Sequence, residues 1–139
     1  ADGAVQAAVS AADLGDRIEL TGRIPSDELD QLLTGASVVA FPSTYEGFGI
    51  PVLEALASGV PVVVGAGTPA ADLAGDTALT VDPANPVAWA EALDRLLSDT
   101  EQRNRAARSG LARIIGHTWE DSAARLEDAW RRLLISRQR

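Results

Sequence analysis

The chain has 139 residues, of which 46% are hydrophobic and only 4% aromatic, and it carries a net charge of −8. This length suits one domain with a substantial core, and the acidic balance argues against nucleic acid as a partner, because binding to it needs a surplus of basic residues. With no cysteine and a single histidine, the composition provides for neither a disulfide framework nor a thiolate metal site, and it disfavours zinc.

Four short segments rich in Ile, Val and Leu predict β-strands. The first alternates apolar and polar residues, as a half-exposed strand does. The second and third are continuous apolar runs, which are typical of strands covered on both faces of a parallel sheet, and the fourth is shorter. In chain order the expected strands are Arg17–Thr21, Val38–Phe41, Val60–Val64 and Ala78–Val81.

Helices are expected between and after these strands, because apolar residues recur at helical spacing between start and stop signals such as Ser26 and Gly59. The expected helices are Val5–Ala12, a helix from Ser26 through Leu33, Pro51–Ser58, Pro86–Leu97, Glu101–Ile115 and Trp119–Ile135. Strands that alternate with helices predict right-handed crossovers and an α/β fold, with a parallel doubly wound sheet followed by an all-helical C-terminal segment. Residues 1–85 would form the sheet with its crossover helices, and residues 86–139 the C-terminal helices.

The sequence favours structural roles for the three tryptophans and for the single histidine. The three tryptophans lie on helices with apolar stripes, and nothing around them indicates a stacking platform for nucleic acid. We therefore expect Trp89, Trp119 and Trp130 to be packing residues and His117 to be structural. Thr118 followed by Asp121 resembles a capping box at the start of the last helix.

Two carboxylates, Glu46 and Glu54, flank a glycine-rich turn and the start of a helix. Pro51 suits the first helical position, since it has no N–H to leave unpaired. Gly47 and Gly49 let the backbone approach a ligand and leave amides free at the positive end of the helix, which suits an anion such as phosphate. Carboxylates accept hydrogen bonds from vicinal hydroxyls. The pattern predicts a site for a sugar nucleotide at the carboxyl end of a buried strand.

The segment Pro42–Val63 resembles the signature of the retaining GT-B glycosyltransferases, in the large family often called group 1 or family 4. Three further stretches resemble the same family in the same order, and four ordered matches are far more specific than one glycine-rich loop. These stretches are Ile18–Pro25, Ala74–Pro83 and His117–Glu120. The resemblance implies that residues 1–139 form part of a domain that binds the donor sugar nucleotide, in the C-terminal half of such an enzyme.

The resemblance also implies roles for individual residues. Glu46, the expected catalytic residue, would approach the donor's sugar hydroxyls near the reacting carbon, and Glu54 would hold the ribose hydroxyls. The backbone amides expected to meet the sugar and the diphosphate are those of Gly47, Phe48, Gly49 and Ile50. The residues expected against the base are Arg23 and Ile24.

For the full-length parent, the resemblance implies transfer of a sugar from a nucleoside-diphosphate donor with the anomeric configuration retained. No metal and no other cofactor is expected, so helix amides and positive groups would offset the diphosphate charge. The expected partners are the donor and an N-terminal acceptor domain or a complementary fragment. A cytoplasmic location is expected. A peripheral position at the inner face of the membrane is left open, because nine Arg residues from Arg103 onward make the C-terminal third basic.

One departure from the family affects both activity and folding. In the family, this half begins with two further strands, and a loop there brings an Arg and a Lys to the diphosphate. These 139 residues contain no match to that segment, so the stretch alone is expected to be inactive. Two strands, Arg17–Thr21 and Val38–Phe41, would each lack a neighbour. We expect a separate fragment of the parent, a second copy through swapping, or an altered pairing to close the gap.

Two alternatives stay open. The first is a non-catalytic structural or nucleotide-binding fragment. The second is a dinucleotide-binding Rossmann domain, since Gly65, Gly67 and Ala70 follow an apolar strand with the spacing of the dinucleotide fingerprint. Only Ala70–Ala74 is available for the helix that this fingerprint requires, which is too short for a crossover and makes this alternative the weaker one.

Overall fold

A computed structural model describes residues 2–136 of the chain. The chain divides into two compact units, residues 1–30 and residues 31–139. The fold expected from the sequence lies in the second unit, and each unit is described by itself.

The first unit contains helix α1 (Asp2–Ala11), a 3-10 turn (Gly15–Arg17) and the beginning of helix α2 (Ser26–Gly35). Helix α1 ends where Asp13 and Gly15 take left-handed backbone conformations, with φ of 49° and 54°. Helix α2 begins with Asp27 and Glu28 in its first turn, where acidic side chains favour the positive helix end.

The strand predicted over Arg17–Thr21 is wrong. Arg17 belongs to the 3-10 turn, and residues 18–21 are not assigned to a strand. Ile18 does have extended dihedrals, with φ −125° and ψ 123°. Ile18 thus has the backbone conformation of a strand, but within the described chain residues 18–21 pair with no neighbouring strand that would complete a ladder.

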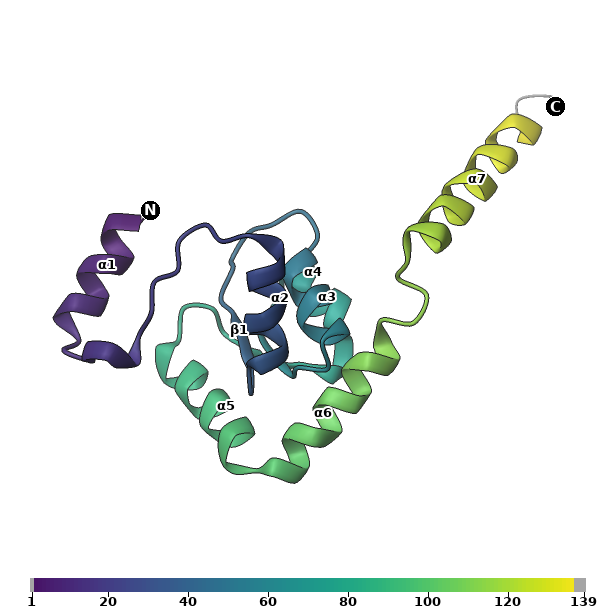
Figure 1. The fold of residues 1–139 in the computed structure, drawn as a ribbon. Coiled ribbons are helices and arrows are strands. Elements are labelled where there is room, and N and C mark those ends of the chain that lie inside the picture. The colour runs from purple at the N-terminus through teal and green to yellow at the C-terminus, as the bar shows by residue number, and fades with distance from the viewer. Residues whose placement is uncertain (1, 137–139) are drawn as a thin grey trace. The chain divides into compact units, whose positions relative to one another are not determined.

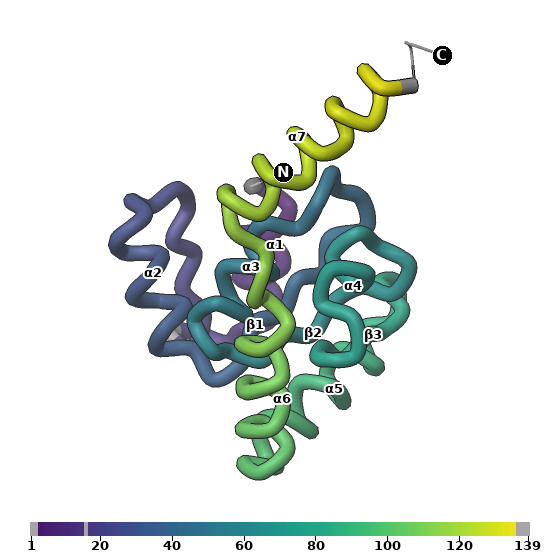
Figure 2. Tube along the Cα trace, turned by 90° about the vertical axis from the view of Figure 1, so that its right-hand side faces the viewer, coloured from purple at the N-terminus to yellow at the C-terminus, as the bar shows by residue number. Residues whose placement is uncertain are grey.

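The second unit is built on a three-stranded parallel sheet in the order β1-β2-β3. Figure 2 labels the strands in this order. Their register pairs Val39 with Val62 and Val63 with Leu79. The strands are β1 (Val39–Phe41), β2 (Val62–Gly65) and β3 (Leu79–Val81).

Helices cover both faces of this sheet, as the alternation of strands and helices predicts (Figure 1). On one face, α3 (Ile50–Ala57) and α4 (Pro69–Ala74) pack around Val62 and Val64. On the other, α5 (Pro86–Ser98) packs around Val63, and Ala106 of α6 (Thr100–Arg113) joins this cluster. Helix α7 (Trp119–Ser136) ends the described chain. The α/β parallel fold class is therefore confirmed.

The central strand and the outer strand differ in burial. All four residues of β2 are buried, as its continuous Val run predicts. In β1, by contrast, Val39 and Phe41 are half-buried and Ala40 is exposed, so the prediction that this strand is covered on both faces is wrong. Within the described chain, β1 pairs with β2 alone. A strand at the edge of a sheet has only part of its surface covered, and what completes this edge stays a prediction.

Helix α3 is terminated at Gly59, the stop signal expected from the sequence. Gly59 has a φ of 71°, and its N–H donates to Leu56 O at 3.1 Å while the N–H of Val60 donates to Ala55 O at 3.0 Å. This pair of bonds is a Schellman closure, which satisfies the last carbonyls and turns the chain directly into β2.

Gly110 on α6 gives a test of how closely α6 packs on α3. A Cβ on Gly110 would lie 2.6 Å from Cδ2 of Leu56, whose side chain is fully buried. Gly110→Ala should therefore force the core to shift and lower the free energy of unfolding by about 1–3 kcal/mol. Gly35→Ala, at a position with nothing within 4 Å of the added methyl group, is the matched control and should change it by less than about 1 kcal/mol. Urea unfolding measures both variants, and equal stability would contradict the packing described.

Candidate functional site

The candidate site begins where β1 ends and the chain loops to α3. Gly49 is the residue before α3 and has a φ of 98°, which only glycine adopts easily. Its carbonyl accepts hydrogen bonds from Val52 N at 2.9 Å and Leu53 N at 3.3 Å, and Pro51 in the first turn has no N–H. No side chain of the residue before the helix caps this end. The positive end of α3 therefore begins without a side-chain cap from Gly49, an arrangement that suits an anion.

Glu46 places a carboxylate oxygen beside this end of α3. Its Oε1 is shielded from solvent, and within the described chain it has no hydrogen-bond partner. The same oxygen lies 3.4 Å from the point that a Cβ on Gly49 would occupy. A buried carboxylate oxygen without a donor is costly. It therefore indicates that water or a ligand supplies the missing hydrogen bond.

Gly49 also meets the beginning of α4. A Cβ on Gly49 would lie 3.1 Å from both Cα and Cβ of Ala70, which is fully buried. This contact brings the first turns of α3 and α4 together at the carboxyl ends of β1 and β2. Ligands of open parallel sheets bind at that edge.

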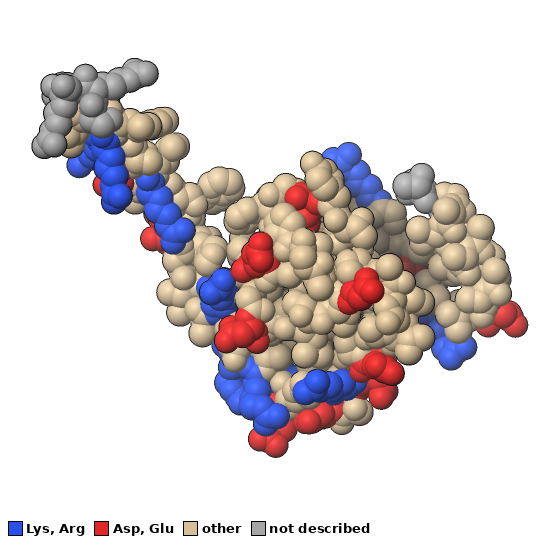
Figure 3. All heavy atoms as spheres, turned by 180° about the vertical axis from the view of Figure 1, so that it is seen from behind, with Lys and Arg blue, Asp and Glu red and all other residues tan. Residues whose placement is uncertain are grey.

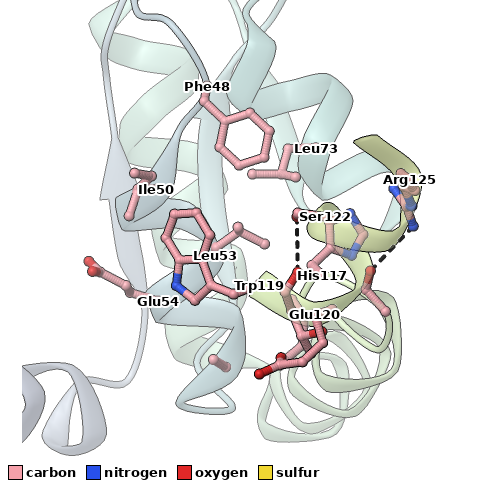
Figure 4. Close-up of a pocket in the computed structure, with 14 residues that line it drawn as sticks. Phe48, Ile50, Leu53, Glu54, Leu73, His117, Trp119, Glu120, Ser122 and Arg125 are labelled. Carbon is pink, nitrogen blue, oxygen red and sulfur yellow. Dashed lines mark hydrogen bonds between the residues drawn. The ribbon is translucent and has the colours of Figure 1, made fainter. Parts of the chain in front are cut away.

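A pocket of about 700 Å³ lies along the side of α3 (Figure 4). Its walls are mainly apolar, and they come from α3 and the loop before it, the end of α4, the segment between α6 and α7, and the start of α7. The lining residues are Phe48, Ile50, Leu53, Glu54, Ala57, Leu73, Ile114, Gly116, His117, Thr118, Trp119, Glu120, Ser122 and Arg125. Figure 4 shows the Glu54 carboxylate directed away from the side chains on the opposite wall.

The wall formed by α7 is held by local hydrogen bonds. Thr118 Oγ1 donates to Asp121 Oδ2 at 2.7 Å and accepts from Asp121 N at 3.1 Å, so the predicted capping of this helix is confirmed. Ser122 Oγ donates to Thr118 O at 2.9 Å, and Arg125 Nη2 donates to Gly116 O at 3.3 Å (Figure 4). These bonds tie the first turns of α7, which begins at Trp119, to the segment that follows α6.

The predicted site residues lie in four different settings. Glu46 and Gly49 are neighbours at the start of α3. Phe48, Ile50 and Glu54 line the pocket, and Gly47 is exposed with open space around it. Arg23 and Ile24 belong to the first unit, and their place against the base stays a prediction.

Sequence reasoning missed the contribution of α7 to this pocket. Trp119 is 87% exposed and Trp130 is 60% exposed, so the prediction that both are packing residues is wrong. For Trp89 it is confirmed, because this side chain packs against the cluster around Val63. The capping signal at Thr118 marked where α7 begins, but no pattern indicated that this turn would face α3.

Charges on the C-terminal helices are mixed. Three Arg side chains form i,i+4 ion pairs on helix surfaces, Arg105 with Glu101, Arg131 with Glu127 and Arg132 with Asp128. Figure 3 shows basic and acidic side chains interspersed over one face of the molecule. This pattern is that of solvated helix faces. Among the described residues, no helix is long and apolar enough to cross a membrane, and no group of three or more His, Cys, Asp or Glu side chains is placed to hold a metal ion.

The segment that resembles a dinucleotide fingerprint leads into a short helix. Helix α4 has six residues and ends at Ala74, followed directly by a 3-10 turn. The fingerprint places the pyrophosphate on a helix long enough to cross back over the sheet. The sequence argument against a Rossmann dinucleotide site at Gly65, Gly67 and Ala70 was that the following helix is too short. The structure confirms that this helix is short.

Comparison with known proteins identifies the family. The sequence pattern of the family described as "Glycosyl transferases group 1" matches residues 4–113. The chain belongs to this family. The glycosyltransferase resemblance carried by Pro42–Val63 is thus confirmed.

Individual relatives of this glycosyltransferase family agree. The chain is 41% identical over 111 residues to the D-inositol 3-phosphate glycosyltransferase of Corynebacterium urealyticum, covering 78% of this chain and 26% of that protein. It is 34% identical over 116 residues to the O-antigen chain mannosyltransferase B of Escherichia coli, covering 84% of this chain and 30% of that protein. The chain thus spans less than a third of the length of these relatives.

Solved structures show the same fold. A sucrose-phosphate synthase from Thermosynechococcus elongatus matches 95% of this chain, with a TM-score of 0.85 and 30% identity, over 34% of its own length. The C-terminal domain of a glycosyl transferase group 1 family protein from Francisella tularensis matches 82% of the chain, with a TM-score of 0.72 and 29% identity, over 60% of its own length. The described sheet and helices are thus those of the C-terminal domain of a GT-B glycosyltransferase.

The two glycines of the signature turn provide a test of the site's geometry. Gly49→Ala should lower the free energy of unfolding by about 1–3 kcal/mol, because the methyl group would meet Ala70 and the left-handed backbone would be strained. Gly47→Ala should change it by less than about 1 kcal/mol, since Gly47 has open space around it and no positive φ. Thermal unfolding followed by circular dichroism compares the two variants. A Gly49→Ala protein as stable as Gly47→Ala would contradict the close contact with Ala70.

Proposed function

We propose that this chain is the donor-side part of a retaining glycosyltransferase, and that a nucleoside-diphosphate sugar binds where α3 begins. One observation supports this proposal more than any other. Among the described residues, no donor reaches the buried carboxylate oxygen of Glu46, which lies beside a helix end that the preceding residue, Gly49, does not cap. A sugar hydroxyl would supply the donor, and a diphosphate would meet the free end of the helix.

The two acids would serve different parts of the donor. Glu46, which is half-buried against Gly49, would accept hydrogen bonds from the transferred sugar next to its reacting carbon. Glu54 lies one turn into α3 and is exposed, so that it would accept from the ribose hydroxyls. The backbone from Gly47 to Ile50 would pass along the diphosphate. As the bond to the leaving nucleoside diphosphate breaks, helix amides and positive groups would offset the growing negative charge without a metal ion.

The whole reaction belongs to a longer protein, because the chain spans about 26 to 31% of the curated relatives that it matches. The acceptor would be bound by an N-terminal domain, a complementary fragment could complete the sheet, and the anomeric configuration would be retained. We expect the 139 residues to bind the donor without turning it over, since the basic segment implied by the resemblance is not among them. The proposed location of the parent is the cytoplasm.

Substitution of the two acids tests the division of roles. Glu54→Gln should weaken binding of both the nucleotide and the sugar nucleotide by about 10- to 100-fold, the loss expected when a hydrogen bond to a charged group is removed. Glu46→Gln should weaken only the sugar nucleotide. Isothermal calorimetry with UDP, GDP, UDP-glucose and GDP-mannose measures both effects. In the full-length parent, the same Glu46→Gln change should mainly lower turnover.

The matched control for these substitutions is Glu91→Gln, which neutralises an exposed carboxylate on α5, and it should leave all affinities unchanged. Dissociation constants weaker than millimolar for every nucleotide would favour a non-catalytic fragment. Small and equal effects of Glu46→Gln and Glu54→Gln would also count against the proposal. Titration with NADH provides the remaining comparison, since tight binding there would favour the dinucleotide alternative.

A further inference from the structure

The segment Gly65–Ala70 has the spacing of a dinucleotide fingerprint, yet the proposed function gives it no task. It forms the turn between the end of β2 and the start of α4. Three of its residues are buried, and two of these contact the loop that carries Glu46.

The first contact is made by Gly65. A Cβ at this position would lie 3.1 Å from the carbonyl oxygen of Ser43 and 2.9 Å from Cγ of Pro83. Ser43 is the second residue of the loop after β1. Because Gly65 has no side chain, the backbone at the beginning of the Glu46 loop can lie directly against the end of β2.

The second contact is made by Ala70. This residue is fully buried, and a Cβ on Gly49 would lie only 3.1 Å from its Cα and Cβ. Gly49 is the last residue of the Glu46 loop, and the unpartnered Oε1 of Glu46 lies 3.4 Å from the same point. A larger side chain at residue 70 would press on Gly49 and on the carboxylate behind it.

Thr68 joins these two contacts into one rigid turn. Its side chain is 3% exposed, and its Oγ1 donates to Gly65 O at 2.8 Å while accepting from Ala71 N at 3.2 Å. Gly67 provides the reversal of the chain between them, with a φ of 72°. The hydroxyl of Thr68 therefore ties the end of β2 to the first turn of α4.

We propose that Thr68 and Ala70 are positioning residues for Glu46, in a turn that holds the Glu46 loop at Ser43 and at Gly49. The glycine-and-alanine pattern thus serves close backbone contact with this loop, and its resemblance to a dinucleotide fingerprint reflects the same need for small residues. The inference that this positioning helps Glu46 to bind the sugar of the donor rests on the proposed function. The geometric relation among Thr68, Ala70 and Glu46 does not depend on it.

The first experiment tests the geometry without a ligand, in the full 139-residue chain. Thr68→Val removes the hydroxyl at nearly constant shape, Thr68→Ser retains it, and Asp99→Ala removes a comparable cap at the start of α6, where Asp99 Oδ1 accepts from Gln102 N at 2.8 Å. Nuclear magnetic resonance then follows the amide signals of Glu46 and Gly49 and the side-chain carboxyl carbon of Glu46. We expect these signals to move in Thr68→Val, and to stay in place in Thr68→Ser and Asp99→Ala.

Ala70→Val provides an independent variant, because it adds bulk against Gly49 and leaves the Thr68 hydroxyl in place. It should shift the same signals of Glu46 and Gly49. If this variant fails to fold, the three variants at Thr68 and Asp99 still decide the question. Unmoved signals in Thr68→Val, or equal movement in Asp99→Ala, would overturn the proposal.

The second experiment measures the consequence for binding. Thr68→Val should weaken the sugar nucleotide about tenfold relative to the nucleotide alone, because only the sugar meets Glu46. Adding Glu46→Gln to Thr68→Val should then cost less than it does in the unaltered chain. An unchanged ratio in Thr68→Val, with normal binding by the unaltered chain, would overturn the positioning role. If the unaltered chain binds no nucleotide, the proposed function fails for this chain, and the resonance comparison alone decides whether Thr68 and Ala70 position Glu46.

Discussion

The contact between Gly49 and Ala70 is the constraint on which the candidate site depends. It joins the first turns of two helices at distances that leave no room for a further methyl group. Because the chain approaches so closely here, α3 begins at the carboxyl edge of the sheet without a side-chain cap from Gly49, and a carboxylate oxygen of Glu46 is enclosed beside it. A polar group that is enclosed without a partner in the described chain costs stability, and this cost is what the proposed binding of a donor would offset.

The rest of the second unit supports that corner by tight packing of small residues. The fully buried β2 sets the middle of the sheet, and the Schellman closure at Gly59 leads α3 directly into it. On the far side of α3, Gly110 of α6 lets Leu56 pack without a gap. Arg113 of α6 donates through Nε to Leu73 O at 3.0 Å, which ties the end of α4 to the same helix. Both helices that meet at Gly49 are therefore held at a second point as well.

Much of this architecture follows from local sequence signals. Helix starts and stops were predictable because caps, prolines and glycines act within a few residues, and β2 was predictable because its Val run can only be buried. The failure at residues 17–21 has a physical cause, since a strand needs a neighbour that local sequence cannot supply. Trp119 was assigned to packing because an apolar stripe does not reveal whether another element covers it.

The residues of the candidate site could be predicted from the sequence, but the contacts among them could not. The acids and glycines of the signature turn could be named because their chemistry is local. The enclosure of Glu46 depends on Ala70, which is 24 positions further along the sequence and belongs to another helix. A short sequence pattern cannot indicate a contact between residues that are so far apart in the chain. The same pattern of glycines that indicates a cofactor in one fold can serve backbone contact in another.

Two of the three tryptophans, Trp89 and Trp119, can report optically on different parts of the chain. Trp89 is half-buried and packs against the cluster around Val63 of β2, with its indole N–H enclosed and, within the described chain, lacking an acceptor, so its emission follows the integrity of the sheet. Trp119 lies in the wall of the pocket and is open to solvent, so its emission responds to whatever enters beside α3. Fluorescence from one unlabelled sample can thus distinguish loss of structure from occupation of the cavity.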